Sequence, residues 1–128
     1  RLTRKLGAMG ASQSLLEGKT VDPQSAKAAG LVDEVVPADQ LMARAKEWVL
    51  SSVGTDLSKP WDRKDYKMPG GAPYHPAGYM TFVGASAMVN AKTFGVYPAA
   101  KALLSAVYEG ALVNFDNALK IEARWFTN

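Results

Sequence analysis

The sequence predicts a mostly α-helical chain with one short β-strand, and three observations support this fold class. Apolar residues recur at helical spacing in several segments, most clearly over residues 39–53. Prolines or capping side chains open these segments and glycines close them, as is typical of helices. Residues 31–36, LVDEVV, instead form a short run rich in β-branched residues, which favours a strand. We therefore expect six helices and a single strand.

The segment from Gly18 to Pro37 organises the first half of the chain. Asp22 is a good N-cap, because its carboxylate can accept hydrogen bonds from the free N–H groups of the first turn. Pro23 then occupies the first helical position, where a missing N–H costs nothing. Gly30 can adopt the left-handed conformation that ends a helix. The segment therefore predicts a turn, a short helix, a glycine stop and the strand at residues 31–36.

Helices are expected on both sides of this segment. Residues 1–6 read as the end of a helix or a turn, and residues 8–17 place apolar side chains at helical spacing. Residues 39–53 form an amphipathic helix with its charged side chains facing outward. The remaining helices are expected at residues 77–93, 97–110 and 114–128.

A long connection, residues 55–76, separates the two helical parts of the chain. It contains four prolines and three aromatic residues. Loops of this length are usually functional segments or linkers, and disordered linkers contain few aromatic residues. We therefore expect an ordered linker that Trp61 and Tyr66 hold against a surface. It divides the chain into residues 1–54, the linker 55–76 and a helical region 77–128.

Composition and charge exclude several classes of protein. The formal net charge is +3, and even the densest basic run, residues 59–67, contains two aspartates, so no nucleic-acid-binding face is indicated. The chain has no cysteine, which excludes disulfides and thiolate metal sites. No apolar run approaches the ~20 residues that a membrane-spanning helix needs. With no signal-peptide pattern at its start, the chain is expected to be cytoplasmic.

Candidate catalytic and metal-binding residues are few. His75, the only histidine, could act as a general base or a metal ligand. No second type of ligand clusters beside it, so we interpret it as an ordinary loop residue. Asp33 and Glu34 are adjacent in the expected strand and would point to opposite faces. Glu109 and Glu122 lie in separate helices and are better explained by capping or salt bridges. The sequence predicts no catalytic residue and no metal site.

The segment GKTVDPQSAKAAGLVDEVVP closely resembles part of the crotonase superfamily of enoyl-CoA hydratases and isomerases. The matching residues are Gly18, Ala26, Ala29, Gly30, Leu31, Val32, Asp33, Val35, Val36 and Pro37. Residues 59–71 and 97–126 resemble the hydratase region of the fused hydratase–dehydrogenase chains of fatty-acid β-oxidation. The resemblance covers essentially the whole chain, but only the C-terminal part of a hydratase domain.

The resemblance implies that the chain is the C-terminal helical region of a crotonase α/β fold, with one short strand. In the family, two backbone N–H groups hold the thioester carbonyl, and two glutamates of hydratases manage the protons of water. These features precede the matching segment, so no residue here corresponds to a catalytic position. The parent enzyme is expected to use a coenzyme A thioester and, in a dehydrogenase domain, NAD. The implied partners are the N-terminal crotonase half and that C-terminal dehydrogenase domain.

The resemblance also implies a lid over the acyl-CoA pocket, formed by the last helix. The weak candidates for it are Phe115, Leu119, Trp125 and Phe126. Apolar residues at helical spacing are also what a plain core stripe requires, and that is the default explanation.

Two functions remain open. The chain is either part of a β-oxidation enzyme, not catalytic alone, or a non-catalytic helical assembly or binding module. Its apolar helix faces predict self-association.

Overall fold

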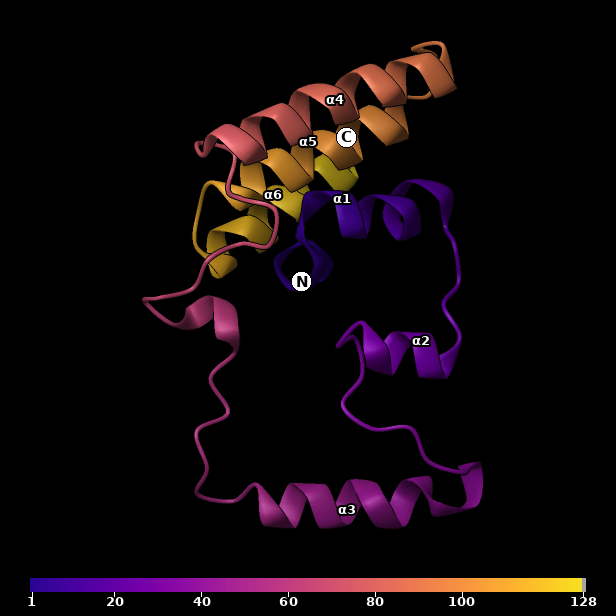
Figure 1. Ribbon diagram of the computed structural model, residues 1–128, viewed down its shortest axis with the longest axis vertical. Helices are drawn as coiled ribbons and strands as arrows, with labels where there is room; N and C mark the ends of the chain where they lie inside the picture. Colours follow the sequence, from indigo (N-terminus) through magenta and orange to yellow (C-terminus); the bar gives the residue numbers. More distant parts are fainter. Residues whose placement is uncertain (128) are drawn as a thin grey trace.

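The computed structural model describes residues 1–127, which are mostly helical (Figure 1). The helices are α1 (Leu2–Glu17), α2 (Pro23–Ala28), α3 (Leu41–Ser51), α4 (Pro76–Thr93), α5 (Pro98–Ala111) and α6 (Phe115–Thr127), with 3₁₀ turns η1 (Ala38–Gln40) and η2 (Pro60–Asp62). The helical fold class and the six helices predicted from the sequence are confirmed over these residues. None of these helices combines the length and apolar character needed to cross a bilayer.

Helices α1, α4, α5 and α6 form a cluster that we call the four-helix cluster (Figure 1). Helices α5 and α6 form an antiparallel hairpin, and α1 and α4 pack on α5. Phe82 of α4 is 5% exposed, and its ring meets Tyr108 of α5 edge-on, with 5.2 Å between ring centroids. The other buried apolar residues of the cluster are small or β-branched: Ala8, Ala11, Ala85 and Val89. Small residues let the helix backbones approach closely, so the core of the cluster contains few large side chains.

The predicted strand at residues 31–36 is wrong. These residues form bends and irregular backbone, and the part of the chain that the structure describes contains no strand. The N–H group of Leu31 donates to the carbonyl of Ala26 at 2.8 Å and so closes α2. A lone extended run is unstable without a partner, and β-branched composition favours a strand only where a neighbouring strand offers one. The described residues supply none.

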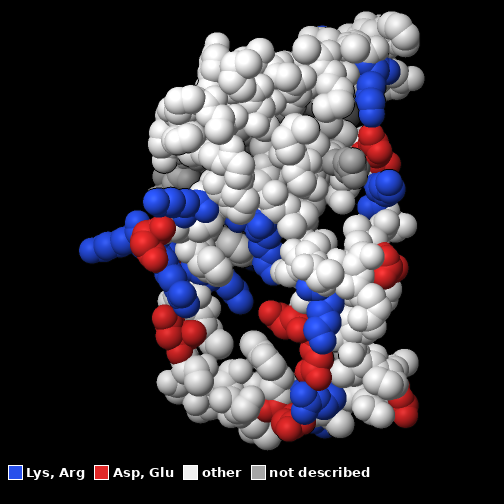
Figure 2. All heavy atoms as spheres, viewed as in Figure 1, with Lys and Arg blue, Asp and Glu red and all other residues white. Residues whose placement is uncertain are grey.

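Residues 18–54 lead away from the four-helix cluster, and we call this part of the chain the lobe; the linker, residues 55–76, returns to the cluster (Figure 1). The lobe contains α2, η1 and α3. Asp22 caps α2 as predicted, accepting hydrogen bonds from the N–H groups of Gln24 and Ser25 at 3.1 and 3.0 Å. On the face drawn in Figure 2, most charged side chains gather around the lobe and the linker, and the part of the four-helix cluster visible there shows few of them.

The linker between the lobe and α4 is held against the four-helix cluster by the two aromatic residues that the sequence singled out. The Trp61 ring lies 5.5 Å from the ring of Phe115, and the Tyr66 hydroxyl donates to the carbonyl of Arg4 at 2.8 Å. Gly7 allows the linker to approach α1, because its φ is 74° and a Cβ there would lie 2.3 Å from the carbonyl oxygen of Pro69. Gly7 also kinks α1 between its first turn and the helix predicted at residues 8–17.

Candidate functional site

A groove of about 1000 Å³ runs between the first turn of α1, the helix α5 and the helix α6. Its lining is mainly apolar and includes Leu2, Leu15, Leu103, Val107 and Ala118. The groove therefore suits an apolar chain better than a small polar molecule.

All four predicted lid residues line this groove. Phe115 lies near its α1 side, and Leu119, Trp125 and Phe126 follow along α6. Phe115 and Trp125 are half-buried, Leu119 is 40% exposed and Phe126 is 90% exposed. The structure thus brings the four side chains to one wall, none of them fully buried. Their role as a lid stays a prediction.

The position of α6 is fixed at both ends. At its start, the Asn114 side chain accepts a hydrogen bond from the N–H group of Asn117 at 3.0 Å and so caps the helix. Further along, the Glu109 carboxylate of α5 accepts from the indole N–H of Trp125 at 3.0 Å and pairs with Arg124. Glu109 therefore forms the salt bridge that its sequence position suggested, and it orients the Trp125 ring at the groove.

Arg4 is the residue of the groove that the sequence did not reveal. Its guanidinium donates to the carbonyl oxygens of Gly110 and Val113 at 3.0 and 2.6 Å. It also lies 5.8 Å from the centre of the Phe115 ring, and the guanidinium of Arg1 lies 5.7 Å from the same ring. The Phe115 ring therefore makes cation–π contacts with Arg4 of α1 and with Arg1, the residue before α1. The partners of Arg4 are more than 100 residues away, so no local sequence signal marks it.

Three further polar residues line the groove or lie close to it. Lys101 of α5 and Glu122 of α6 contribute to the lining. The hydroxyl of Tyr66 donates to the carbonyl of Arg4, and burial raises the pKa of this hydroxyl although the Arg4 charge acts in the opposite direction. Glu122 lines the groove, whereas Glu109 does not line it and is engaged with Trp125 and Arg124. This arrangement offers binding surface rather than a pair of catalytic carboxylates.

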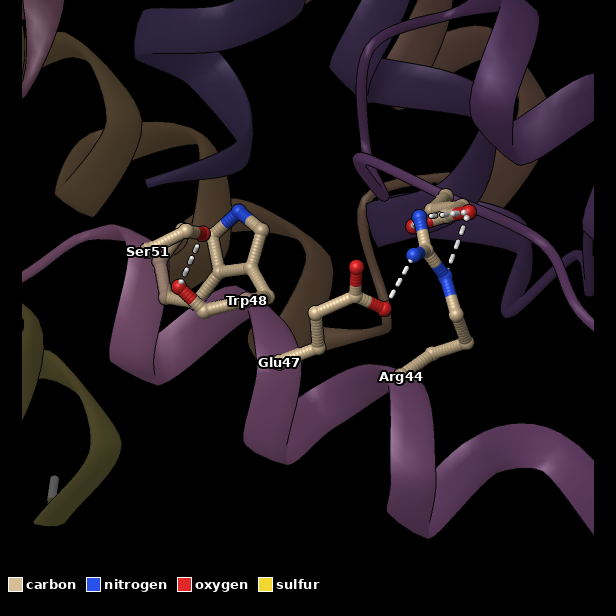
Figure 3. A network of polar contacts seen from close by, with 5 residues as sticks. Arg44, Glu47, Trp48 and Ser51 are labelled. Atoms are coloured by element: carbon tan, nitrogen blue, oxygen red, sulfur yellow. Dashed lines mark hydrogen bonds and ion pairs between the residues drawn. The ribbon is translucent and has the colours of Figure 1, made fainter.

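The remaining candidate residues described by the structure cap a helix or form salt bridges. His75 lines a smaller cavity of about 480 Å³ and caps α4, its Nδ1 accepting from the N–H group of Ala77 at 3.3 Å. Glu34 pairs with Arg44 at 2.9 Å, and Arg44 also pairs with Glu47 on α3 (Figure 3). Over the residues that the structure describes, no three potential ligands gather into a metal-binding group.

Comparisons with known proteins agree with the sequence resemblance. The family model "Enoyl-CoA hydratase/isomerase" matches residues 1–54, which hold α1, α2 and α3. The chain is 33% identical over 132 residues to the fatty acid oxidation complex subunit alpha of Shewanella amazonensis and 32% identical over 126 residues to that of Shewanella loihica. The protein of the same name from Vibrio parahaemolyticus is 29% identical over 126 residues. Each match covers 98% of this chain, and the chain spans only 17% of the length of each of these relatives.

Proposed function

Since residues 1–54 match the enoyl-CoA hydratase/isomerase family model, we propose that the chain is part of a fatty-acid β-oxidation enzyme. Its proposed role is to supply the helical shell around an acyl-CoA site and the contacts between domains. One observation carries this proposal. The groove joins α1, which lies in the family-matching residues, to α5 and α6, which lie outside them. The similarity to proteins named fatty acid oxidation complex subunit alpha extends over both parts.

The chemistry of the groove supports an acyl thioester as the ligand. Each methylene group that moves from water into an apolar site contributes about 0.8 kcal/mol. The apolar lining of α5 and α6 therefore favours the acyl chain, and Leu119 and Phe126 lie where they can cover it. Arg1 and Lys101 supply positive charge for the phosphate groups of coenzyme A.

The activity of the whole enzyme is part of the same proposal. It comprises hydration of a 2-enoyl-CoA and NAD-dependent oxidation of the resulting 3-hydroxyacyl-CoA, each performed by residues outside this chain. The partners would be an N-terminal crotonase half and a C-terminal dehydrogenase domain. A cytoplasmic location, as expected from the sequence, is part of this proposal.

Titration with dodecenoyl-CoA, followed by tryptophan fluorescence, tests the groove as the acyl-CoA site. We expect dodecenoyl-CoA to bind more tightly than free coenzyme A, and Leu119→Arg to weaken its binding at least tenfold. Leu57→Arg is the matched control, because Leu57 is an exposed leucine of the linker that does not line the groove. Equal binding of the two ligands, or unchanged binding by Leu119→Arg, would refute the proposal.

A hydration assay tests whether the chain is catalytic alone. The proposal predicts no hydration of a short 2-enoyl-CoA above background, because no residue of the chain corresponds to a catalytic position. Turnover that survives repurification and is lost on replacing His75 or Glu109 with alanine would show that the chain carries its own active site.

A further inference from the structure

One carboxylate fixes both the edge and the face of the Trp125 ring at the groove. The indole Nε1–H of Trp125 donates to Oε1 of Glu109 at 3.0 Å. The other carboxylate oxygen of Glu109, Oε2, accepts from Nη2 of Arg124 and forms an ion pair with it. The Arg124 guanidinium in turn lies 5.8 Å from the centre of the Trp125 ring. We call these three side chains the Glu109 clamp.

Trp125 lies in a part of α6 that its own backbone holds weakly. It is in the last turn of α6, which ends at Thr127. The carbonyl groups of a last turn have no partners within the helix, so helix ends fray. The Glu109 clamp reaches this turn from α5, and its hydrogen bond joins residues that are 16 positions apart. Glu109 therefore holds the last turn of α6, and the half-buried Trp125 ring with it, against α5.

We infer that Glu109 is a positioning residue of the groove. It does not line the groove itself, but it holds the Trp125 indole ready to pack against an apolar chain. A mobile side chain that becomes fixed when a ligand binds lowers the affinity by about two- to tenfold. Because the Glu109 clamp fixes Trp125 before binding, the groove avoids this loss. The inference rests on the proposed function for the identity of the ligand.

Titration with dodecenoyl-CoA tests the inference through two variants of Glu109. Glu109→Leu removes both contacts of the carboxylate and should weaken binding about three- to tenfold. Glu109→Gln keeps an acceptor for the indole N–H and loses only the exposed ion pair with Arg124, so its affinity should stay within about twofold of the wild type. Glu47→Leu is the matched control, because Glu47 also pairs with an arginine on a helix and lies outside the groove.

A double-mutant cycle shows whether Glu109 acts through the indole N–H. Trp125→Phe keeps an aromatic ring at the groove but has no N–H group to donate. In that background, Glu109→Leu should change the affinity for dodecenoyl-CoA by less than about twofold. A loss as large as that caused by Glu109→Leu alone would overturn the inference, because Glu109 would then act on the fold or on the ligand itself.

The indole N–H signals in a ¹H–¹⁵N spectrum supply a readout that needs no ligand. The chain has three tryptophans, and Trp125→Phe identifies the signal of Trp125. Its heteronuclear NOE, which reports fast motion, should be high in the wild type and in Glu109→Gln and low in Glu109→Leu. An ordered indole in Glu109→Leu, or wild-type affinity of that variant, overturns the inference. If the wild type does not bind dodecenoyl-CoA, the proposed function fails, and the order of the indole alone decides whether Glu109 positions Trp125.

Discussion

Replacing Arg4 with methionine tests whether one side chain of α1 fixes the turn between α5 and α6. The substitution keeps an unbranched side chain but removes the donors to the carbonyl oxygens of Gly110 and Val113. It also removes one of the two guanidinium groups that lie over the Phe115 ring. A hydrogen bond from a charged donor contributes about 1.5–3 kcal/mol, and a cation–π contact at an accessible site about 0.5–1 kcal/mol.

The expected loss of unfolding free energy for Arg4→Met is about 3 kcal/mol. We take the lower end of the hydrogen-bond range, because Arg4 is only partly buried, and contributions to one network do not add fully. With a urea dependence of about 1.5–2 kcal/mol per molar, the unfolding midpoint should fall by about 1.5–2 M. Circular dichroism at 222 nm measures this transition, and all samples need the same protein concentration because association contributes to stability.

Two further variants separate this network from general effects of charge. Arg4→Lys keeps the positive charge but loses the planar fork, so it should fall between the wild type and Arg4→Met. Lys5→Met is the neighbouring control on α1, since exposed Lys5 donates one hydrogen bond, to the carbonyl of Gly30 at 2.5 Å. It should cost less than about 1 kcal/mol. Stability of Arg4→Met within about 0.5 kcal/mol of the wild type would refute the reasoning.

Three other outcomes follow from the structure. Phe82→Ala should lower the unfolding free energy by about 3 kcal/mol, because it empties the centre of the α4–α5 contact. Met80→Ala, at a 66% exposed position of the same helix, should change the unfolding free energy by no more than about 0.5 kcal/mol. Equal urea midpoints for the two variants would contradict this prediction. Gly7→Ala should destabilise the chain by more than about 2 kcal/mol, because the alanine would have to adopt a positive φ and its Cβ would clash with Pro69. An unchanged melting curve would show that the linker is not held against α1 at Gly7. Hydrogen bonding by Ser25 lowers the pKa of Asp22, so the cap stabilises α2 above the pKa of the unfolded chain and is lost as the pH falls through the lower folded pKa. Amide exchange in α2 should therefore accelerate in acid, and Asp22→Asn, which can still cap, should remove the pH dependence.

Local signals explain which parts of the fold the sequence could predict. The caps Asp22 and Asn114 act within one turn of their own helices, so both could be identified from the residues alone. The four candidate lid residues occupy one wall because they share a single helix, where spacing determines the face. The irregular backbone at residues 31–36 could not be foreseen, since a strand depends on a partner that composition does not reveal. Arg4 was missed for the same reason: its acceptors are distant in the sequence.

The contacts of α1 show that the segment matched by the family model does not fold independently of the rest of the chain. The match to the family model ends at residue 54, at the end of the lobe, where few packing contacts exist. The part of the chain that packs together has other boundaries, because Arg4 hydrogen-bonds to the α5–α6 turn and Gly7 accommodates the backbone at Pro69. Exchanging residues 1–54 for those of another protein that matches the same family model should therefore succeed only if the donor carries an arginine and a glycine at these two positions. The end of the family-model match and the boundary of cooperative folding therefore fall at different places in this chain.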